Sequence, residues 1–87
     1  MILIDEAVWP AHDTLWGHLV SDTSLEELHA FAREAGIPER GFDNDHYDYP
    51  LRRRDELIAQ GAVPVTGREL LRRLQAAGLR VRQKDKR

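Results

Sequence analysis

The residues best suited to chemistry in this sequence lie close together in the middle of the chain. Residues 43–50 read Asp-Asn-Asp-His-Tyr-Asp-Tyr-Pro, so three carboxylates, one imidazole and two phenols share eight positions. An imidazole beside a carboxylate can act as an oriented general base, and a phenol can donate a proton. On a β-strand His46 and Asp48 project from one face and Tyr47 from the other. We predict these three residues as catalytic candidates.

Carboxylates and histidines also occur around the predicted strand ends. Asp5 follows the aliphatic run at residues 2–4, and Asp22 follows the run at residues 18–21. In a parallel sheet the carboxyl ends of strands meet at one edge, where ligands bind. Carboxylates suit Mg²⁺ or Mn²⁺, and imidazoles shift the preference towards Mn²⁺ or Zn²⁺. The predicted divalent-metal ligands are Asp5, His18, Asp22, His46 and Asp48. In the alternative interpretation these side chains only hold turns and cap a helix.

The same region is suited to a small anion. His18 and Asp22 precede a predicted helix, whose unpaired backbone amides attract negative charge. Trp16 shares a segment with Trp9 and offers a flat surface to a planar ligand; alternatively, the indoles cover the core or an interface. We predict binding of a divalent metal (Mg²⁺, Mn²⁺ or Zn²⁺) or a small phosphate-containing ligand through His18, Asp22 and Trp16. If the site is catalytic, metal-assisted phosphoester hydrolysis is the predicted reaction class.

Strands alternating with helices are expected to position these residues. Capping-box patterns at Thr23 and Thr66 predict helices over residues 24–35 and 67–77, and a weaker pattern predicts a third over residues 51–60. Residues 6–17 are predicted to form a loop because they lack a clear period. The predicted strands cover residues 2–4, 18–21, 46–49, 62–65 and 79–82. The expected fold is a small single α/β domain with a mostly parallel sheet of three to five short strands and about three helices.

Composition limits the size and class of the protein. Its 87 residues suffice for one domain, which we place at residues 1–82, followed by a basic frayed tail at residues 83–87. The sequence contains no cysteine, which excludes disulfides and thiolate metal sites. No apolar run approaches the roughly 18 residues of a membrane span. We therefore predict a cytoplasmic protein that does not bind membranes.

Charge is distributed unevenly along the chain. Residues 1–50 contain 2 basic and 11 acidic side chains, whereas residues 51–87 contain 11 basic and 4 acidic ones. The two halves can attract each other within one fold or build a homo-oligomer interface. A non-enzymatic interaction or oligomerisation module, using the tryptophans and this asymmetry, is therefore the main alternative function. Nucleic-acid binding through Arg68 and Arg72 is less favoured, because the net charge is −2 and no recognition motif is present.

Two motifs resemble those of a known family. They are His-Leu-x-x-Asp-Thr at residues 18–23 and His-Tyr-Asp at residues 46–48. Together with the opening strand that ends in Asp5, they make the chain similar to the bacterial and phage family called domain of unknown function 4031. The resemblance implies a compact α/β module and adds Arg54 as an anion contact, but it implies no reaction. The residues that it singles out as one set are His18, Asp22, His29, His46, Tyr47, Asp48 and Arg54.

Overall fold

A computed structural model describes residues 1–81 as an α/β domain built on one six-stranded sheet. The strand order is β4-β5-β3-β1-β6, and β2 pairs with the outer half of β3. The predicted α/β class is therefore confirmed. The strands are β1 (Ile2–Ile4), β2 (Trp9–Ala11), β3 (Thr14–Ser21), β4 (Phe42–Asp43), β5 (His46–Pro50) and β6 (Val63–Pro64).

The sheet is mixed, and the predicted predominance of parallel pairing is not observed. Within residues 1–81 only β1 and β6 pair in parallel, and the other four pairings are antiparallel. Two of the antiparallel pairs are hairpins closed by two-residue turns, at residues 12–13 and 44–45. A turn this short reverses the chain, whereas a parallel pair needs a longer crossover. The predicted last strand is also absent from the described residues 79–81.

The segment predicted to be a loop, residues 6–17, instead contains β2 and the first half of β3. His12 and Asp13 both have positive φ angles, 48° and 63°, as a tight type I′ hairpin turn requires. The sequence conceals this hairpin because it lacks the usual Asn-Gly signal and carries Pro10 within a strand. Proline is tolerated there because β2 is an edge strand.

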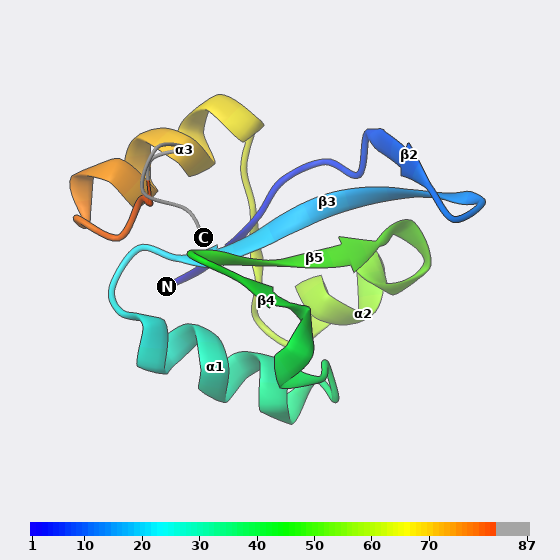
Figure 1. Cartoon of the computed structure of the whole chain (residues 1–87), viewed down its shortest axis with the longest axis horizontal. Helices are drawn as coiled ribbons and strands as arrows, with labels where there is room; N and C mark the ends of the chain where they lie inside the picture. The colour runs from blue at the N-terminus through cyan, green and yellow to red at the C-terminus, as the bar shows by residue number, and fades with distance from the viewer. Residues whose placement is uncertain (82–87) are drawn as a thin grey trace.

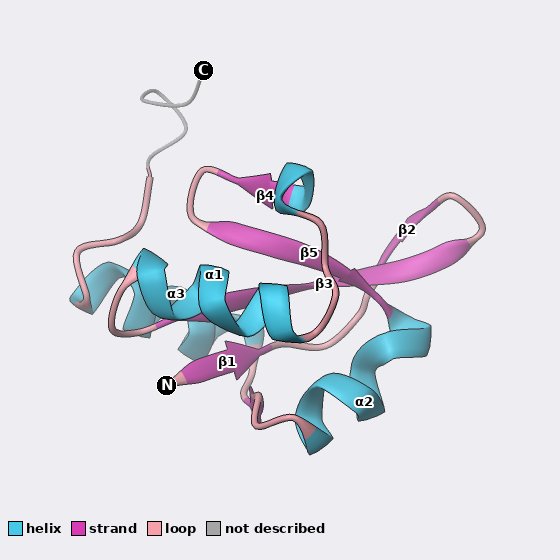
Figure 2. Ribbon diagram, turned by 90° about the horizontal axis from the view of Figure 1, so that it is seen from below, coloured by secondary structure: helices cyan, strands magenta, loops and turns pink. Residues whose placement is uncertain are grey.

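Helices cover both faces of the sheet (Figures 1 and 2). The helix α1 (Leu25–Glu34) and the short α2 (Arg54–Ala59) lie on one face, and α3 (Gly67–Ala76) lies on the other. The weaker predicted helix is divided, because residues 51–53 form a 3₁₀ turn before α2. Within residues 1–81 no helix is long and apolar enough to cross a membrane.

The strand alternation sorts side chains into two cores. Ile4 and Leu19 pack beneath α1 and α2, whereas Leu3 and Val20 pack against α3. His18, like Val20, therefore faces the α3 side of the sheet. Gly17 faces the other side, and a Cβ at this position would lie 2.6 Å from Cε1 of Tyr49 and 2.9 Å from Oδ1 of Asp5.

Candidate functional site

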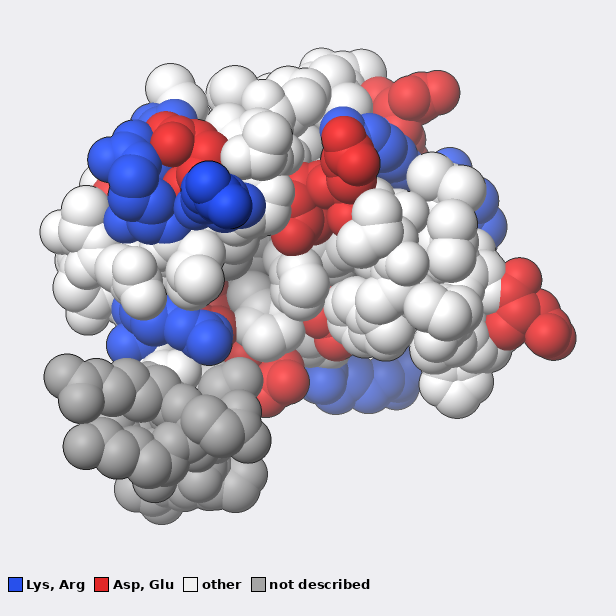
Figure 3. Space-filling model, turned by 90° about the horizontal axis from the view of Figure 1, so that it is seen from above, with Lys and Arg blue, Asp and Glu red and all other residues white. Residues whose placement is uncertain are grey.

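The polar residues of the site form a row across three strands. The register pairs Ile4 with Leu19, so Asp5 comes next to His18, and His18 lies directly opposite Asp48. The row continues diagonally to His46, two positions from Asp48 on β5. All four side chains lie on the face that carries α3, and three of them, Asp5, His18 and His46, line a pocket together with residues of that helix. Figure 3 shows this face, with acidic side chains in the hollow between α3 and the projecting β2–β3 hairpin.

His18 is held in one orientation by Asp5. Its Nδ1 lies 2.8 Å from Oδ2 of Asp5, and its backbone amide donates to Oδ1 of the same carboxylate at 2.6 Å. The ring also stacks on Trp9, with centroids 5.3 Å apart and an interplanar angle of 27°. A neutral imidazole that donates from Nδ1 keeps its lone pair on Nε2. The Nε2 atom of His18 is thus the one available to a ligand.

His46 is oriented in the same way by Asp45, which is not among the residues predicted for the site. The carboxylate of Asp45 is 1% exposed and lies 2.7 Å from Nδ1 of His46. It also accepts hydrogen bonds from the amide of Val81 at 2.8 Å and from Arg80 at 3.2 Å. Although burial opposes ionisation, these donors and the imidazole lower the pKa of Asp45. In the sequence, Asp45 is indistinguishable from an ordinary turn aspartate.

Asp48 completes a three-residue cluster. One ring nitrogen of His18, one of His46 and one carboxylate oxygen of Asp48 all lie within 4.8 Å of one another. Oδ1 of Asp48 is 3.1 Å from Nε2 of His46, yet among the described residues this buried atom has no properly directed hydrogen bond. A buried acceptor without a donor is costly and uncommon. A cation placed between the three atoms would satisfy it.

The protonation of His46 predicts a pH-dependent stability for the metal-free protein. Burial disfavours the imidazolium, but Asp48 and Asp45 outweigh it and raise the pKa of His46 above its ordinary 6.5. The resulting stabilisation is fully present below pH 6.5 and is lost as the pH rises through the folded-state pKa. Urea unfolding in EDTA should therefore show a free energy of unfolding that falls as the pH increases above 6.5.

The control for this experiment is His46→Gln. The N-terminal amine also has a raised pKa, because the carboxylates of Glu27 and Asp22 outweigh its desolvation, and it destabilises the fold when it loses its proton at higher pH. This contribution is present in both proteins, so the difference between their pH profiles belongs to His46. Parallel profiles would contradict the assignment.

Two other candidates from the sequence lie outside the cluster. Asp22 binds the N-terminal amine at 3.0 Å and Arg73 at the far end of β3. It does not converge with Asp5, because β1 and β3 are antiparallel. The carboxyl end of each strand therefore lies beside the amino end of the other. Arg54 donates to the backbone carbonyl of Asp5 and, at 2.7 Å, to the hydroxyl of Tyr49. Its contacts support the end of β1 from the opposite face.

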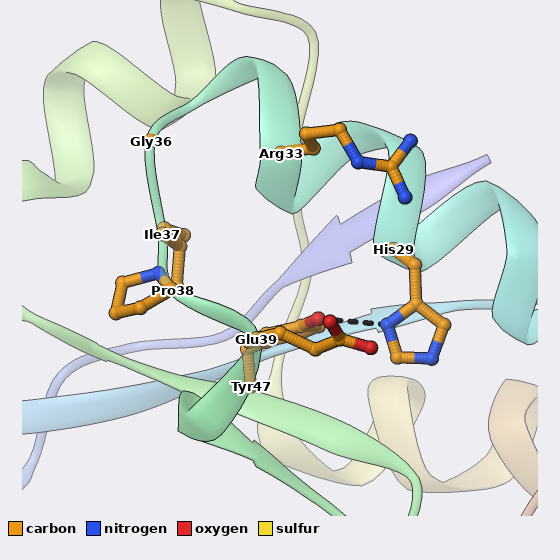
Figure 4. A pocket seen from close by; sticks show the side chains of 7 residues that line it. All are labelled: His29, Arg33, Gly36, Ile37, Pro38, Glu39 and Tyr47. Carbon is orange, nitrogen blue, oxygen red and sulfur yellow. Dashed lines mark hydrogen bonds between the residues drawn. The ribbon is translucent and has the colours of Figure 1, made fainter.

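Tyr47 lies on the other face of β5, where it meets His29 (Figure 4). Its hydroxyl is 2.7 Å from Nδ1 of His29, at the wall of a pocket of about 370 Å³ between α1 and the following loop. Burial, assisted by the nearby charge of Glu39, raises the pKa of the Tyr47 phenol. The sheet therefore separates Tyr47 from His46 and Asp48. Trp16, the remaining candidate, is on β3 and packs against Trp9 with ring centroids 6.4 Å apart.

Comparison with known proteins gives one match. The model of the family described as "Protein of unknown function (DUF4031)" matches residues 2–77. No curated protein and no solved structure matches the chain. The match covers every strand and helix described above.

Proposed function

Because the chain belongs to the DUF4031 family, whose description names no reaction, we propose a function from the site itself: His18, His46 and Asp48 bind a divalent transition metal. The observation that carries this proposal is the use of the Nδ1 atoms. Each histidine directs Nδ1 to a separate carboxylate, Asp5 or Asp45, and so leaves Nε2 for a ligand; Nε2 of His46 lies 3.1 Å from Oδ1 of Asp48. Outer carboxylates of this kind orient the histidine ligands of many metal sites.

The ligand types favour zinc over magnesium. Two imidazoles and one carboxylate are a common ligand set of catalytic Zn²⁺ and of related transition metals, whereas Mg²⁺ prefers oxygen ligands and bound water. Three protein ligands also leave a coordination position open to water or substrate. The predicted oxygen-rich set is thereby reduced to three direct ligands. Asp5 acts through His18, and Asp22 lies at the other end of β3.

An open position on such a metal is suited to hydrolysis. A cation held by His18, His46 and Asp48 would lower the pKa of a coordinated water and supply hydroxide near neutral pH. In phosphoester hydrolysis this hydroxide would form a new bond to phosphorus while the bond from phosphorus to the ester oxygen breaks. The proton released by the water passes through solvent to the departing oxygen, so that phosphate and alcohol are the products. Metal-assisted phosphoester hydrolysis is therefore the reaction class that we propose.

Titration of EDTA-treated protein with Zn²⁺ and with Mg²⁺ tests the metal site. A metal present at 100 times its dissociation constant stabilises the fold by about 2.7 kcal/mol. For a domain of this size, such a change raises Tm by roughly 10–20 °C. We expect this shift with Zn²⁺ and a much smaller one with Mg²⁺, with calorimetry giving one Zn²⁺ per chain. Equal small shifts for both ions, in wild type and in Asp48→Asn alike, would contradict a metal site.

A further inference from the structure

An open strand edge lies next to the proposed metal site. The strand β4 pairs only with His46 and Tyr47 of β5, so the following residues 48–50 have no partner strand on that side within residues 1–81. A groove of about 660 Å³ lies along this edge and is lined by Asp48 and Pro50. We call it the β5 edge groove. Asp48 belongs both to the groove and to the metal cluster, whereas His18 and His46 line a separate pocket of about 340 Å³, so the two sites share Asp48 as a common residue.

Three arginines line the groove, and two of them have no ion pair or side-chain hydrogen bond within residues 1–81. Arg53 donates to Glu56 and to the carbonyl of Ala35. Arg40 and Arg52 are exposed, and neither forms an ion pair or side-chain hydrogen bond with any of residues 1–81. Guanidinium groups bind phosphate oxygens in pairs of parallel hydrogen bonds. The two side chains therefore provide a place for a phosphate within the groove.

The groove also has an aromatic part of its lining. Trp16 and His12 line it from the β2–β3 hairpin. The indole of Trp16 donates from Nε1 to the carbonyl of Ala11 at 2.9 Å, which fixes its orientation before any ligand binds. A fixed aromatic ring loses little conformational entropy when a planar group packs against it. The groove thus combines cationic and aromatic side chains.

We propose that the β5 edge groove binds a nucleotide, with its phosphate against Arg40 and Arg52 and its base against Trp16. This inference rests on the proposed function for one part only, the cleavage of the phosphoester by the bound metal. Binding itself requires no metal. A phosphorylated sugar has the phosphate of a nucleotide but no base. Comparing its affinity with that of a nucleotide therefore separates the contribution of the arginines from that of Trp16.

The first test measures binding of AMP to the protein in EDTA, by calorimetry or by NMR titration. We expect the double variant Arg40→Gln/Arg52→Gln to bind AMP at least about tenfold more weakly, since each lost charge-assisted hydrogen bond has an effect of this size. The matched control, Arg33→Gln/Arg68→Gln, removes the same charge from exposed positions on other elements. Equal affinities in the two double variants, or no binding to the wild type, would overturn the proposal.

Two further measurements determine separately how much Trp16 and the bound metal contribute to the affinity for AMP. Ribose 5-phosphate should bind the wild type about tenfold more weakly than AMP, and Trp16→Leu should remove this difference. Equal binding of the two ligands to the wild type would overturn the assignment to a nucleotide. Zn²⁺ should raise the affinity for AMP in the wild type but not in His18→Ala. If Zn²⁺ does not bind at all, the proposed metal-dependent function is wrong. The measurements in EDTA still show whether the groove binds a nucleotide.

Discussion

Replacing His18 with alanine is expected to abolish Zn²⁺ binding while leaving the fold intact. Loss of an outer carboxylate typically costs 10–100-fold in metal affinity, so loss of a direct ligand should cost more than about 100-fold. The side chain of His18 is 38% exposed, and its removal therefore leaves little buried cavity. Its backbone amide continues to donate to Asp5, so the end of β1 keeps one of its contacts. Calorimetric titration with Zn²⁺ measures the effect directly.

His12→Asn is the matched control for this variant. It also removes a histidine from the β2–β3 hairpin, but at the exposed turn, where the φ angle of 48° suits asparagine. Zn²⁺ affinity and the Zn²⁺-dependent rise in Tm should be those of the wild type. If His12→Asn weakens binding as much as His18→Ala, the ion binds histidines without using the site described here. If His18→Ala binds normally, His18 is not a ligand.

Local signals in the sequence account well for the helices. The pattern at Thr66 is confirmed, because its hydroxyl accepts from the amide of Glu69 and α3 begins at the next residue. The pattern at Thr23 is displaced by one position, since Ser24 is the cap that accepts from Glu27. Both features depend on residues three positions apart, which is why a single sequence can reveal them.

Sheet order depends on contacts that no local pattern contains. The alternation of His46, Tyr47 and Asp48 correctly places the first and third on one face, because it follows from the strand alone. The pairing of His18 with Asp48 depends on the register between two strands, and the paired residues are 30 positions apart in the sequence. Parallel strands would place Asp22 near Asp5, whereas the antiparallel pairing of β1 and β3 separates the two carboxylates and places His18 beside Asp5.

Some of the charges of the acidic and basic halves form ion pairs with each other within the domain. Asp22 pairs with Arg73, and Asp45 pairs with Arg80, so acidic residues of the first half meet basic residues of the second. These contacts join the sheet to α3 and to the segment that follows it. A homo-oligomer interface and a cytoplasmic location stay predictions. The predicted basic tail at residues 83–87 lies outside the described residues.

Asp45→Ala is expected to cause the largest loss of stability among single substitutions at the site. Asp45 is 1% exposed and receives hydrogen bonds from His46, Arg80 and the amide of Val81. Removal of one member of a buried ionic network typically costs 3–5 kcal/mol, because its partners stay buried without compensation. Arg80 is 32% exposed and can turn to solvent, so we expect about 3 kcal/mol, measured by urea unfolding in EDTA.

Asp45→Asn separates the structural role of Asp45 from its role towards the metal. The amide has nearly the same shape, and with its one oxygen in the place of Oδ2 it can still accept from Val81, so stability should fall less than in Asp45→Ala. The amide nitrogen then takes the place of Oδ1 and can no longer accept from Nδ1 of His46, so His46 becomes a poorer ligand and Zn²⁺ affinity should fall by about 10–100-fold. Asp43→Asn is the matched control for stability, because that side chain is 57% exposed and lies 3.9 Å from His46. Its free energy of unfolding should stay within about 0.5 kcal/mol of the wild type. Should Asp45→Asn instead bind Zn²⁺ normally while unfolding as easily as Asp45→Ala, the carboxylate would hold the turn before β5 and have no part in metal binding.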